Sequence, residues 1–483
     1  MNRERFAWSV SVLLLALLAF QIPQGLAQRD NDYAFVRTLV DIHRQVSNSY
    51  VEPVEQSKLE TAAINGMLNT LDPYTVYVPP AEQERFDQSL DGNFKGVGIQ
   101  LNQRDDGRVE VITPIDGSPA FKAGIQPGDI IVKVDGEALK GLKLDPDILK
   151  KIKGAVGSSV MLTVQHDGSD EMLEYTLKRE EVIVPTLKGY SRKVDNTWDY
   201  YVTDEPKIAY VRLTQFTPDS YEKLRVVLTE LQKNGMAGLV FDLRWNPGGR
   251  LDEAVKIINM LVPKGTIVTT KGRNRPEHVE KADGKNTLPY FPMVVLINEH
   301  SASASEIVSG SLMDNRRAVV VGTRSYGKGS VQELIKLDGE TGGELKMTVA
   351  YYYLPSGRLV HKKKDATDWG VEPQINVPMD EATERGVAQA RYEQELVRRP
   401  VAKLTTKPAT KPATTKTATT SPSTQPVVDT QLKSATDLLR MFIILNGNST
   451  DFVNQATTKP VSKSAPASTQ PVGMNRSRSK NLG

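Results

Sequence analysis

A serine-rich turn and a lysine between two glycines are the parts of this 483-residue chain best suited to covalent chemistry. Ser303 lies in His300-Ser-Ala-Ser-Ala-Ser-Glu306, after the apolar run 293–297 and before apolar residues at helical spacing. A turn from a strand into a helix exposes a side chain, and the amides at the helix start can stabilise a developing oxyanion. On its own, this stretch is read equally well as a serine-rich helix N-cap.

The lysine is Lys328, in Tyr326-Gly-Lys-Gly-Ser-Val-Gln332, which lies between a predicted buried strand and an alternating strand. A lysine between two glycines at a loop tip has no packing role that we can name. At its ordinary pKa of about 10.4 a lysine is protonated and cannot act as a base. Burial beside apolar strands would lower that pKa and leave an amine able to take the proton of Ser303. The pair therefore indicates a serine hydrolase with a lysine base.

Together, the two motifs resemble those of the carboxyl-terminal processing (tail-specific) serine peptidases, and the resemblance covers about residues 30–380. It implies that Ser303 is the nucleophile and Lys328 the base. It also implies that Gln332 orients the lysine and that Glu306 is an acidic residue near the dyad.

A third motif, Asp242-Leu-Arg-Trp-Asn-Pro-Gly-Gly249, follows a predicted strand and precedes a predicted helix. Amides in such a turn can meet an anion. The same family has this motif, and the resemblance implies that Gly249 and Ala304 supply the oxyanion hole. Trp245 departs from the family, which usually has a small residue there, and it is expected to narrow the cleft.

No cofactor or metal is expected. The chain has no cysteine, and its five histidines show no metal-ligand spacing. His300 is close to Ser303 in sequence, and a residue so close seldom has the reach of a catalytic base. We therefore do not expect it to act in catalysis.

Residues 1–27 have the pattern of an export signal peptide. Arg3 and Arg5 precede an apolar run from Trp8 to Phe20, and small residues follow at the expected cleavage site. The run is too short to span a bilayer comfortably, so we expect cleavage, with an uncleaved membrane anchor as the alternative. In both cases the body of the protein is exported to the periplasm or cell envelope.

Residues 28–94 predict an N-terminal helical region, and residues 95–181 change to short strands and turns. The ordered set of turns in the second region resembles a PDZ domain. Val97, Gly98 and Ile99 stand where such a domain has its carboxylate-binding loop, whose amides bind the C-terminus of a peptide.

Residues 182–400 predict an α/β domain, which the resemblance makes the protease core. Residues 401–483 form a low-complexity Thr/Pro/Lys-rich tail that cannot bury a core and is expected to be disordered. A short apolar helix over 434–446 interrupts this tail, with Ser434 as its predicted N-cap. It could dock on the protease body, on a partner or on a membrane surface, and the sequence does not choose among these.

The expected fold is therefore a multidomain α+β and α/β chain with a helical arm, a PDZ domain, a Ser–Lys protease core and a disordered tail. The expected function is an exported serine endopeptidase that recognises protein C-termini through its PDZ domain and cleaves the C-terminal regions of extracytoplasmic proteins. The alternative is a catalytically inactive PDZ scaffold that binds peptides. A nucleotide-binding enzyme is disfavoured, because a phosphate loop needs Ser or Thr directly after the lysine and Gly329 stands there.

The expected partners are protein or peptide substrates with free C-termini, and a second copy of the chain or an adaptor protein is a further candidate. No nucleic-acid partner is expected.

Overall fold

The computed structural model describes residues 34–166, 171–338, 342–397 and 427–446. By its contacts the chain forms two compact units, the first made of Met1–Asp87 with Val331–Val349 and the second of Gln88–Ser330 with Ala350–Gly483. The predicted signal peptide, 1–27, and most of the predicted tail lie outside the described residues. None of the helices in the described ranges is both long and apolar enough to cross a membrane.

The first unit is built from helices and a small antiparallel sheet. Residues 34–49 are helical and are followed by α2 (Gln56–Leu68), β1 (Val76–Val78) and α3 (Pro80–Asp91). Strand β1 pairs antiparallel with residues 344–346 of β21 (Glu344–Tyr353), and β20 (Ser330–Lys336) also pairs with β21. These helices agree with the helical pattern predicted for 28–94.

The region predicted as a PDZ domain is a six-stranded sheet with two short helices. Its strand order is β3-β4-β5-β7-β8, with β6 paired to β5. Valine, isoleucine and leucine side chains from both the strands and the helices fill one buried core. The elements are β3 (Ile99–Gln103), β4 (Val109–Pro114), α4 (Pro119–Ala123), β5 (Ile130–Val134), β6 (Glu137–Ala138), a short π-helical turn (Leu144–Ile148), α5 (Leu149–Ile152), β7 (Ser159–Gln165) and β8 (Met172–Lys178). A separate antiparallel pair, β2 (Asn93–Gly96) with β9 (Glu180–Ile183), joins the two ends of this region.

A seven-stranded sheet forms the centre of the second unit, with the order β10-β14-β15-β18-β19-β22 and β13 paired to β14. Strands β14, β15, β18, β19 and β22 are parallel. The strands are β10 (Leu187–Lys188), β13 (Tyr201–Asp204), β14 (Lys207–Leu213), β15 (Gly238–Asp242), β18 (Met293–Ile297), β19 (Val319–Gly322) and β22 (Ile375–Asn376). Every residue of β15, β18 and β19 is buried, which explains their continuous apolar sequences, because a parallel sheet is covered on both faces.

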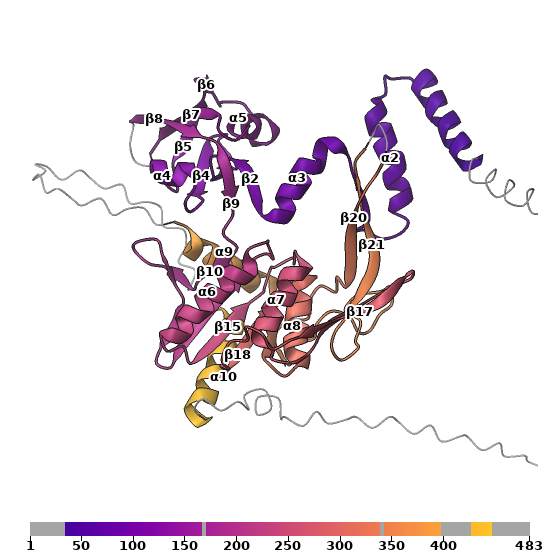
Figure 1. Ribbon diagram of the computed structural model, residues 1–483. Helices are drawn as coiled ribbons and strands as arrows, with labels where there is room; N and C mark the ends of the chain where they lie inside the picture. Colours follow the sequence, from indigo (N-terminus) through magenta and orange to yellow (C-terminus); the bar gives the residue numbers. More distant parts are fainter. Residues whose placement is uncertain (1–33, 167–170, 339–341, 398–426, 447–483) are drawn as a thin grey trace, which may run out of the picture. The chain divides into compact units, whose positions relative to one another are not determined.

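Helices cover both faces of this sheet (Figure 1). Helices α6 (Ser220–Lys233), α7 (Leu251–Leu261) and α8 (Ala304–Asp314) lie on one face, and α10 (Thr430–Asn446) lies on the other. Beside the sheet, β16 (Gly265–Gly272) pairs with β17 (Arg275–Ala282) and with residues 351–353 of β21. The remaining elements are α9 (Glu381–Glu395) and the small hairpin of β11 (Ser191–Arg192) and β12 (Trp198–Asp199).

Helix α10 differs from its prediction in one respect and resolves a choice that the sequence left open. It begins at Thr430 rather than near Ser434, because the Asp429 carboxylate accepts a hydrogen bond from the amide of Leu432 and so caps the helix five residues before the predicted N-cap. Of the three surfaces on which it could dock, the structure shows the protease body. Its buried side chains join the core of the central sheet; they are Leu432, Ala435, Leu439 and Phe442.

Candidate active site

The predicted catalytic motifs follow three neighbouring parallel strands. The chain leaves β15, β18 and β19 into the loops 243–250, 298–303 and 323–329. Because the carboxyl ends of parallel strands meet at one edge of a sheet, the three loops are brought together there, where open α/β sheets form their sites.

Ser303 has an unusual backbone. Its φ is 56° and its ψ is −115°, a conformation that a residue with a side chain rarely adopts. It stands directly before the first residue of α8 and is half-buried. Strain of this kind persists only where the surrounding structure holds it, and it is concentrated at functional sites.

Glu306 holds the main chain at Ser303 and Lys328 together. Its Oε2 accepts hydrogen bonds from the amides of Ser303 and Lys328, both at 2.8 Å. Its Oε1 accepts from the Ser325 hydroxyl and the Gly327 amide, both at 2.6 Å. The two residues of the predicted dyad are therefore joined through a single carboxylate oxygen, at the level of the backbone.

The side chain of Glu306 is fully buried. Burial raises the pKa of Glu306, and the hydrogen bonds from Ser325, Gly327 and the amides of Ser303 and Lys328 act against it. Three of these four partners are amides, which can only donate, so the group meets them as a carboxylate. Glu306 is thus suited to hold the loops in place rather than to transfer a proton.

The glycine turn that carries the predicted donor Gly249 packs against the helix start that carries the other predicted donor, Ala304. A Cβ added to Gly248 would come within 2.7 Å of Ser303 Cβ and 2.9 Å of the amide nitrogen of Ala304, so the glycine turn packs directly against the start of α8. The Gly248 amide already donates to Asn246 Oδ1 at 2.8 Å. Within the described residues, the amides of Gly249 and Ala304 have no protein acceptor, which leaves both able to bind an oxyanion.

Asn246 fixes the distance between the two loops, and its importance was not predicted. Its main-chain carbonyl oxygen accepts a hydrogen bond from the Ala302 amide at 3.0 Å and another from the Ser305 hydroxyl at 2.9 Å. Its side-chain amide donates to the carbonyl of Leu213 at 2.8 Å. The signal was present in the sequence, since an asparagine before Pro-Gly-Gly in an otherwise buried turn needs partners for its amide.

The region around Trp245 is also more constrained than the sequence suggested. Its φ is 58°, and its amide donates to Asn298 Oδ1 at 2.9 Å. Its half-buried indole lies near the guanidinium groups of Arg212 and Arg244 and lines a cavity of about 560 Å³. The tryptophan therefore forms part of a cavity wall next to the predicted oxyanion loop.

Known proteins with related sequences identify the family. The "carboxy-terminal-processing protease" of Bartonella bacilliformis is 36% identical over 378 residues, which cover 76% of this chain and 83% of that protein. The chain belongs to this family. The "carboxy-terminal processing protease CtpB" of Bacillus subtilis is 33% identical over 350 residues, covering 72% of this chain and 68% of its own. Among solved structures, a photosystem II D1 C-terminal processing protease is 29% identical, covers 70% of this chain and 92% of that chain, and has a TM-score of 0.39.

Three family models match successive parts of the chain. Peptidase family S41 matches residues 207–377, and the PDZ domain matches residues 110–166. The N-terminal domain of the activating protease CtpB matches residues 21–81. The predicted family is confirmed, and so is the architecture of N-terminal helices, PDZ domain and protease domain. The general kind of activity, a serine-type protease, is that of the family.

The remaining predicted site residues are Gln332 and the stretch Val97, Gly98 and Ile99. Gln332 is in β20, in the first unit, with its amide nitrogen 3.5 Å from Thr348 Oγ1. Val97, Gly98 and Ile99 form the turn from β2 into β3, with Val97 buried and Gly98 at a φ of 78°. The roles of all four stay predictions.

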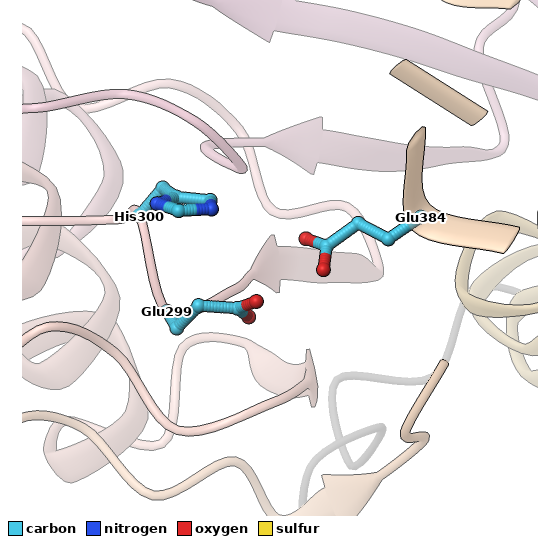
Figure 2. Close-up of side chains that lie close together, drawn as sticks. All are labelled: Glu299, His300 and Glu384. Atoms are coloured by element: carbon cyan, nitrogen blue, oxygen red, sulfur yellow. The ribbon is translucent and has the colours of Figure 1, made fainter. Parts of the chain in front are cut away.

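His300 belongs to a different group of side chains. Figure 2 shows Glu299, His300 and Glu384 pointing toward one another, with their polar atoms within 4.8 Å. Partial burial would raise the pKa of Glu299, but hydrogen bonds from its own amide, Glu384 and Thr323 outweigh this and lower it. Burial, followed by the hydrogen bond to Glu299, raises the pKa of Glu384. Because Glu299 and His300 are exposed, the proximity of the three side chains alone does not make a metal site.

Proposed function

We propose that this chain is an exported serine endopeptidase with a Ser303–Lys328 dyad. It recognises the C-termini of extracytoplasmic proteins through Val97, Gly98 and Ile99 of its PDZ domain and cleaves their C-terminal regions. The observation that carries this proposal is the Glu306 carboxylate, which binds the Ser303 and Lys328 amides through one oxygen. This contact supports the proposal because it joins the strained serine turn and the lysine loop at one buried acid.

In the proposed mechanism, the neutral amine of Lys328 takes the hydroxyl proton of Ser303 as the serine oxygen attacks the scissile carbonyl. The oxyanion that forms is bound by the amides of Gly249 and Ala304. Lys328 then gives its proton to the leaving amine, and an acyl-enzyme remains on Ser303. A water molecule then loses a proton to Lys328 and attacks the acyl-enzyme, and Lys328 returns that proton to the Ser303 oxygen as the ester bond breaks. Gln332 orients the lysine.

Peptidase assays on single variants test the dyad. Ser303→Ala and Lys328→Ala should each remove nearly all cleavage of an unstructured peptide with a free C-terminus, because members of such a unit fail together. Matched controls are Ser356→Ala and Lys364→Ala, which change exposed residues and should leave activity unchanged. Substantial cleavage by Lys328→Ala would contradict the assignment and make His300 the next base to test.

Export is a second part of the proposal and rests on the sequence of residues 1–27. Mass spectrometry of the protein purified from the cell envelope should find a mature N-terminus near residue 28. Recovery of the intact N-terminus in the membrane fraction would instead indicate an uncleaved anchor, and recovery in the cytoplasm would contradict export. The molecular mass of the same purified protein in solution shows whether it forms a homo-oligomer or is bound to an adaptor protein.

A further inference from the structure

Arg244 lies in the motif that leads to the predicted oxyanion loop, and its guanidinium is completely buried. Asp242, two residues earlier, binds it through two oxygens, with the shortest contact at 2.6 Å. Asp429 binds its other side through two oxygens, both at 2.9 Å. Gln431 adds one more acceptor at 3.1 Å. Two of these three groups, Asp429 and Gln431, come from α10 and its cap, at least 185 residues further along the chain.

Charge in this cluster is balanced only when α10 is docked. Asp242 is fully buried and Asp429 is 12% exposed, so neither carboxylate is well solvated. Arg391 of α9 lies 3.6 Å from Asp429 and supplies a second cation. Two buried arginines thus face two buried aspartates, and loss of one partner leaves an uncompensated charge.

The docking of α10 does not depend on this ion pair alone. Leu439 and Ala435 are completely buried against the central sheet, in a cluster with Tyr210 and Val240. Leu439 and Ile443 lie so close to β15 that a Cβ on Gly238 would come within about 3.4 Å of both. Apolar packing therefore brings the Asp429 carboxylate to the end of β15, where Arg244 begins the loop.

The loop that follows Arg244 needs such an anchor. Trp245, the next residue, has a φ of 58° and an indole centred 5.2 Å from the Arg244 guanidinium. Gly248 is wedged against Ser303 and Ala304, and the Gly249 amide is one of the two proposed oxyanion donors. A strained turn keeps its shape only while its surroundings hold it, so a shift of Arg244 would move the donor away from its partner on α8.

We propose that Asp429 is a positioning residue for the protease reaction: carried by α10, it holds Arg244 and through it the loop 245–249 that presents the Gly249 amide. The α10 segment is thus a part of the catalytic centre and not only a cover for the sheet. This role rests on the proposed function, because it assigns the Gly249 amide to the oxyanion. The same contacts also predict a change in the loop that can be measured without catalysis.

The test compares full-length variants at 25 °C, after circular dichroism has shown that each is folded. Asp429→Asn keeps the size of the side chain and removes its charge. We expect its kcat to fall tenfold or more while KM changes less than twofold, because the oxyanion contact forms only in the transition state. Asp429→Glu should recover at least threefold of that loss. Asp437→Asn, an exposed acid on the same helix, is the control and should have the activity of wild type.

Hydrogen exchange gives the readout that is independent of catalysis. In Asp429→Asn, the hydrogen-bonded amides of Trp245, Asn246 and Gly248 should exchange at least tenfold faster than in wild type, whereas those of β5 in the PDZ domain should not change. A kcat within twofold of wild type, or unchanged exchange in 245–249, overturns the proposal. If Ser303→Ala keeps its activity, the proposed dyad fails, and the exchange experiment still decides whether Asp429 holds the loop.

A milder variant covers the case in which Asp429→Asn does not fold. Gln431→Met removes one acceptor from Arg244 and leaves both aspartates in place. We expect about a threefold loss of kcat together with faster exchange in 245–249. Wild-type values for both quantities would overturn the proposal as clearly as those for Asp429→Asn.

Discussion

Glu306 joins the two loops of the proposed catalytic centre through one buried carboxylate. Its four hydrogen-bond partners come from the serine turn and the lysine loop, and all of them donate to the carboxylate. The resemblance to a family placed an acid near the dyad, but the sequence did not show what the acid does. Its role depends on contacts between residues about twenty positions apart, which no local pattern reveals.

Glu306→Gln barely changes the volume of the side chain, but it should lower both stability and activity strongly. The side-chain NH₂ of glutamine is a donor, and it would face backbone amides that are also donors, so no hydrogen bond could form between them. A buried polar group without a partner costs about 1–3 kcal/mol. We expect a loss of unfolding free energy of this order and a fall in kcat of tenfold or more. Urea unfolding and peptidase assays on the purified variant measure both. A variant with the stability and kcat of wild type would show that the carboxylate is not needed to join the two loops.

The ion pairs of Arg244 make a prediction about pH. Burial would raise the pKa of Asp429, but the Arg244 guanidinium outweighs this and lowers it, and the same holds for Asp242. A carboxyl group whose pKa is lowered by folding contributes stability above its ordinary pKa of about 3.9, and that contribution is lost as the pH falls through the folded value. The free energy of unfolding of wild type should thus exceed that of Asp429→Asn by a constant amount from pH 7 to about 5. The difference should shrink below about pH 4.

Denaturant unfolding at a series of pH values measures this difference directly. Breaking a buried ion pair costs about 3–5 kcal/mol, so the effect at pH 7 is well above the error of the method. Asp437→Asn, in which an exposed pair with Lys433 is lost, should change stability by less than about 1 kcal/mol at pH 7. A gap between wild type and Asp429→Asn that stays constant down to pH 3 would show that the Asp429 charge is not the source of the stability.

At the scale of elements, α10 should behave as part of the protease core. Leu439→Ala removes a fully buried side chain from the sheet and should lower the free energy of unfolding by about 2–5 kcal/mol. Leu445→Ala, a matched change on the same helix at a side chain that is 72% exposed, should have an effect within about 0.5 kcal/mol. Equal melting temperatures for the two variants would mean that α10 does not dock on the sheet in solution.

The contrast between α10 and the other elements shows what sequence patterns can predict. The buried strands before each motif were recognisable because a parallel sheet requires continuous apolar runs, and β15, β18 and β19 have them. The predicted start of α10 was wrong because the residue that caps the helix, Asp429, also binds a distant arginine. That contact cannot be seen in the local sequence. The surface on which α10 docks could not be predicted from its apolar residues alone, since they could pack equally well on any apolar surface. The partnership of Asp429 with Arg244 joins residues 185 positions apart and leaves no local signal.

At the scale of the whole molecule, the proposed capture of C-termini predicts a strong dependence on the substrate's terminal charge. Charge-assisted hydrogen bonds to a carboxylate are worth about 1.5–3 kcal/mol each, and each 1.4 kcal/mol is a factor of about ten. Amidation of a peptide's C-terminus should therefore reduce kcat/KM about tenfold or more. The enzyme without residues 95–181, if folded by circular dichroism, should cleave both peptides at the same rate. Equal cleavage of free and amidated peptides by the intact enzyme would contradict recognition through the chain end.

The late position of Asp429 in the chain has a consequence for how the enzyme is made. A polypeptide leaves the ribosome from its N-terminus, so Ser303 and Lys328 emerge well before residues 429–446. Until those residues arrive, Arg244 has only Asp242 as a carboxylate partner, and the loop that presents Gly249 lacks its second anchor. If Asp429 positions this loop as proposed, a nascent chain that already contains every proposed catalytic residue is expected to be inactive. The order of synthesis would then keep an unfinished protease from cleaving the proteins around it.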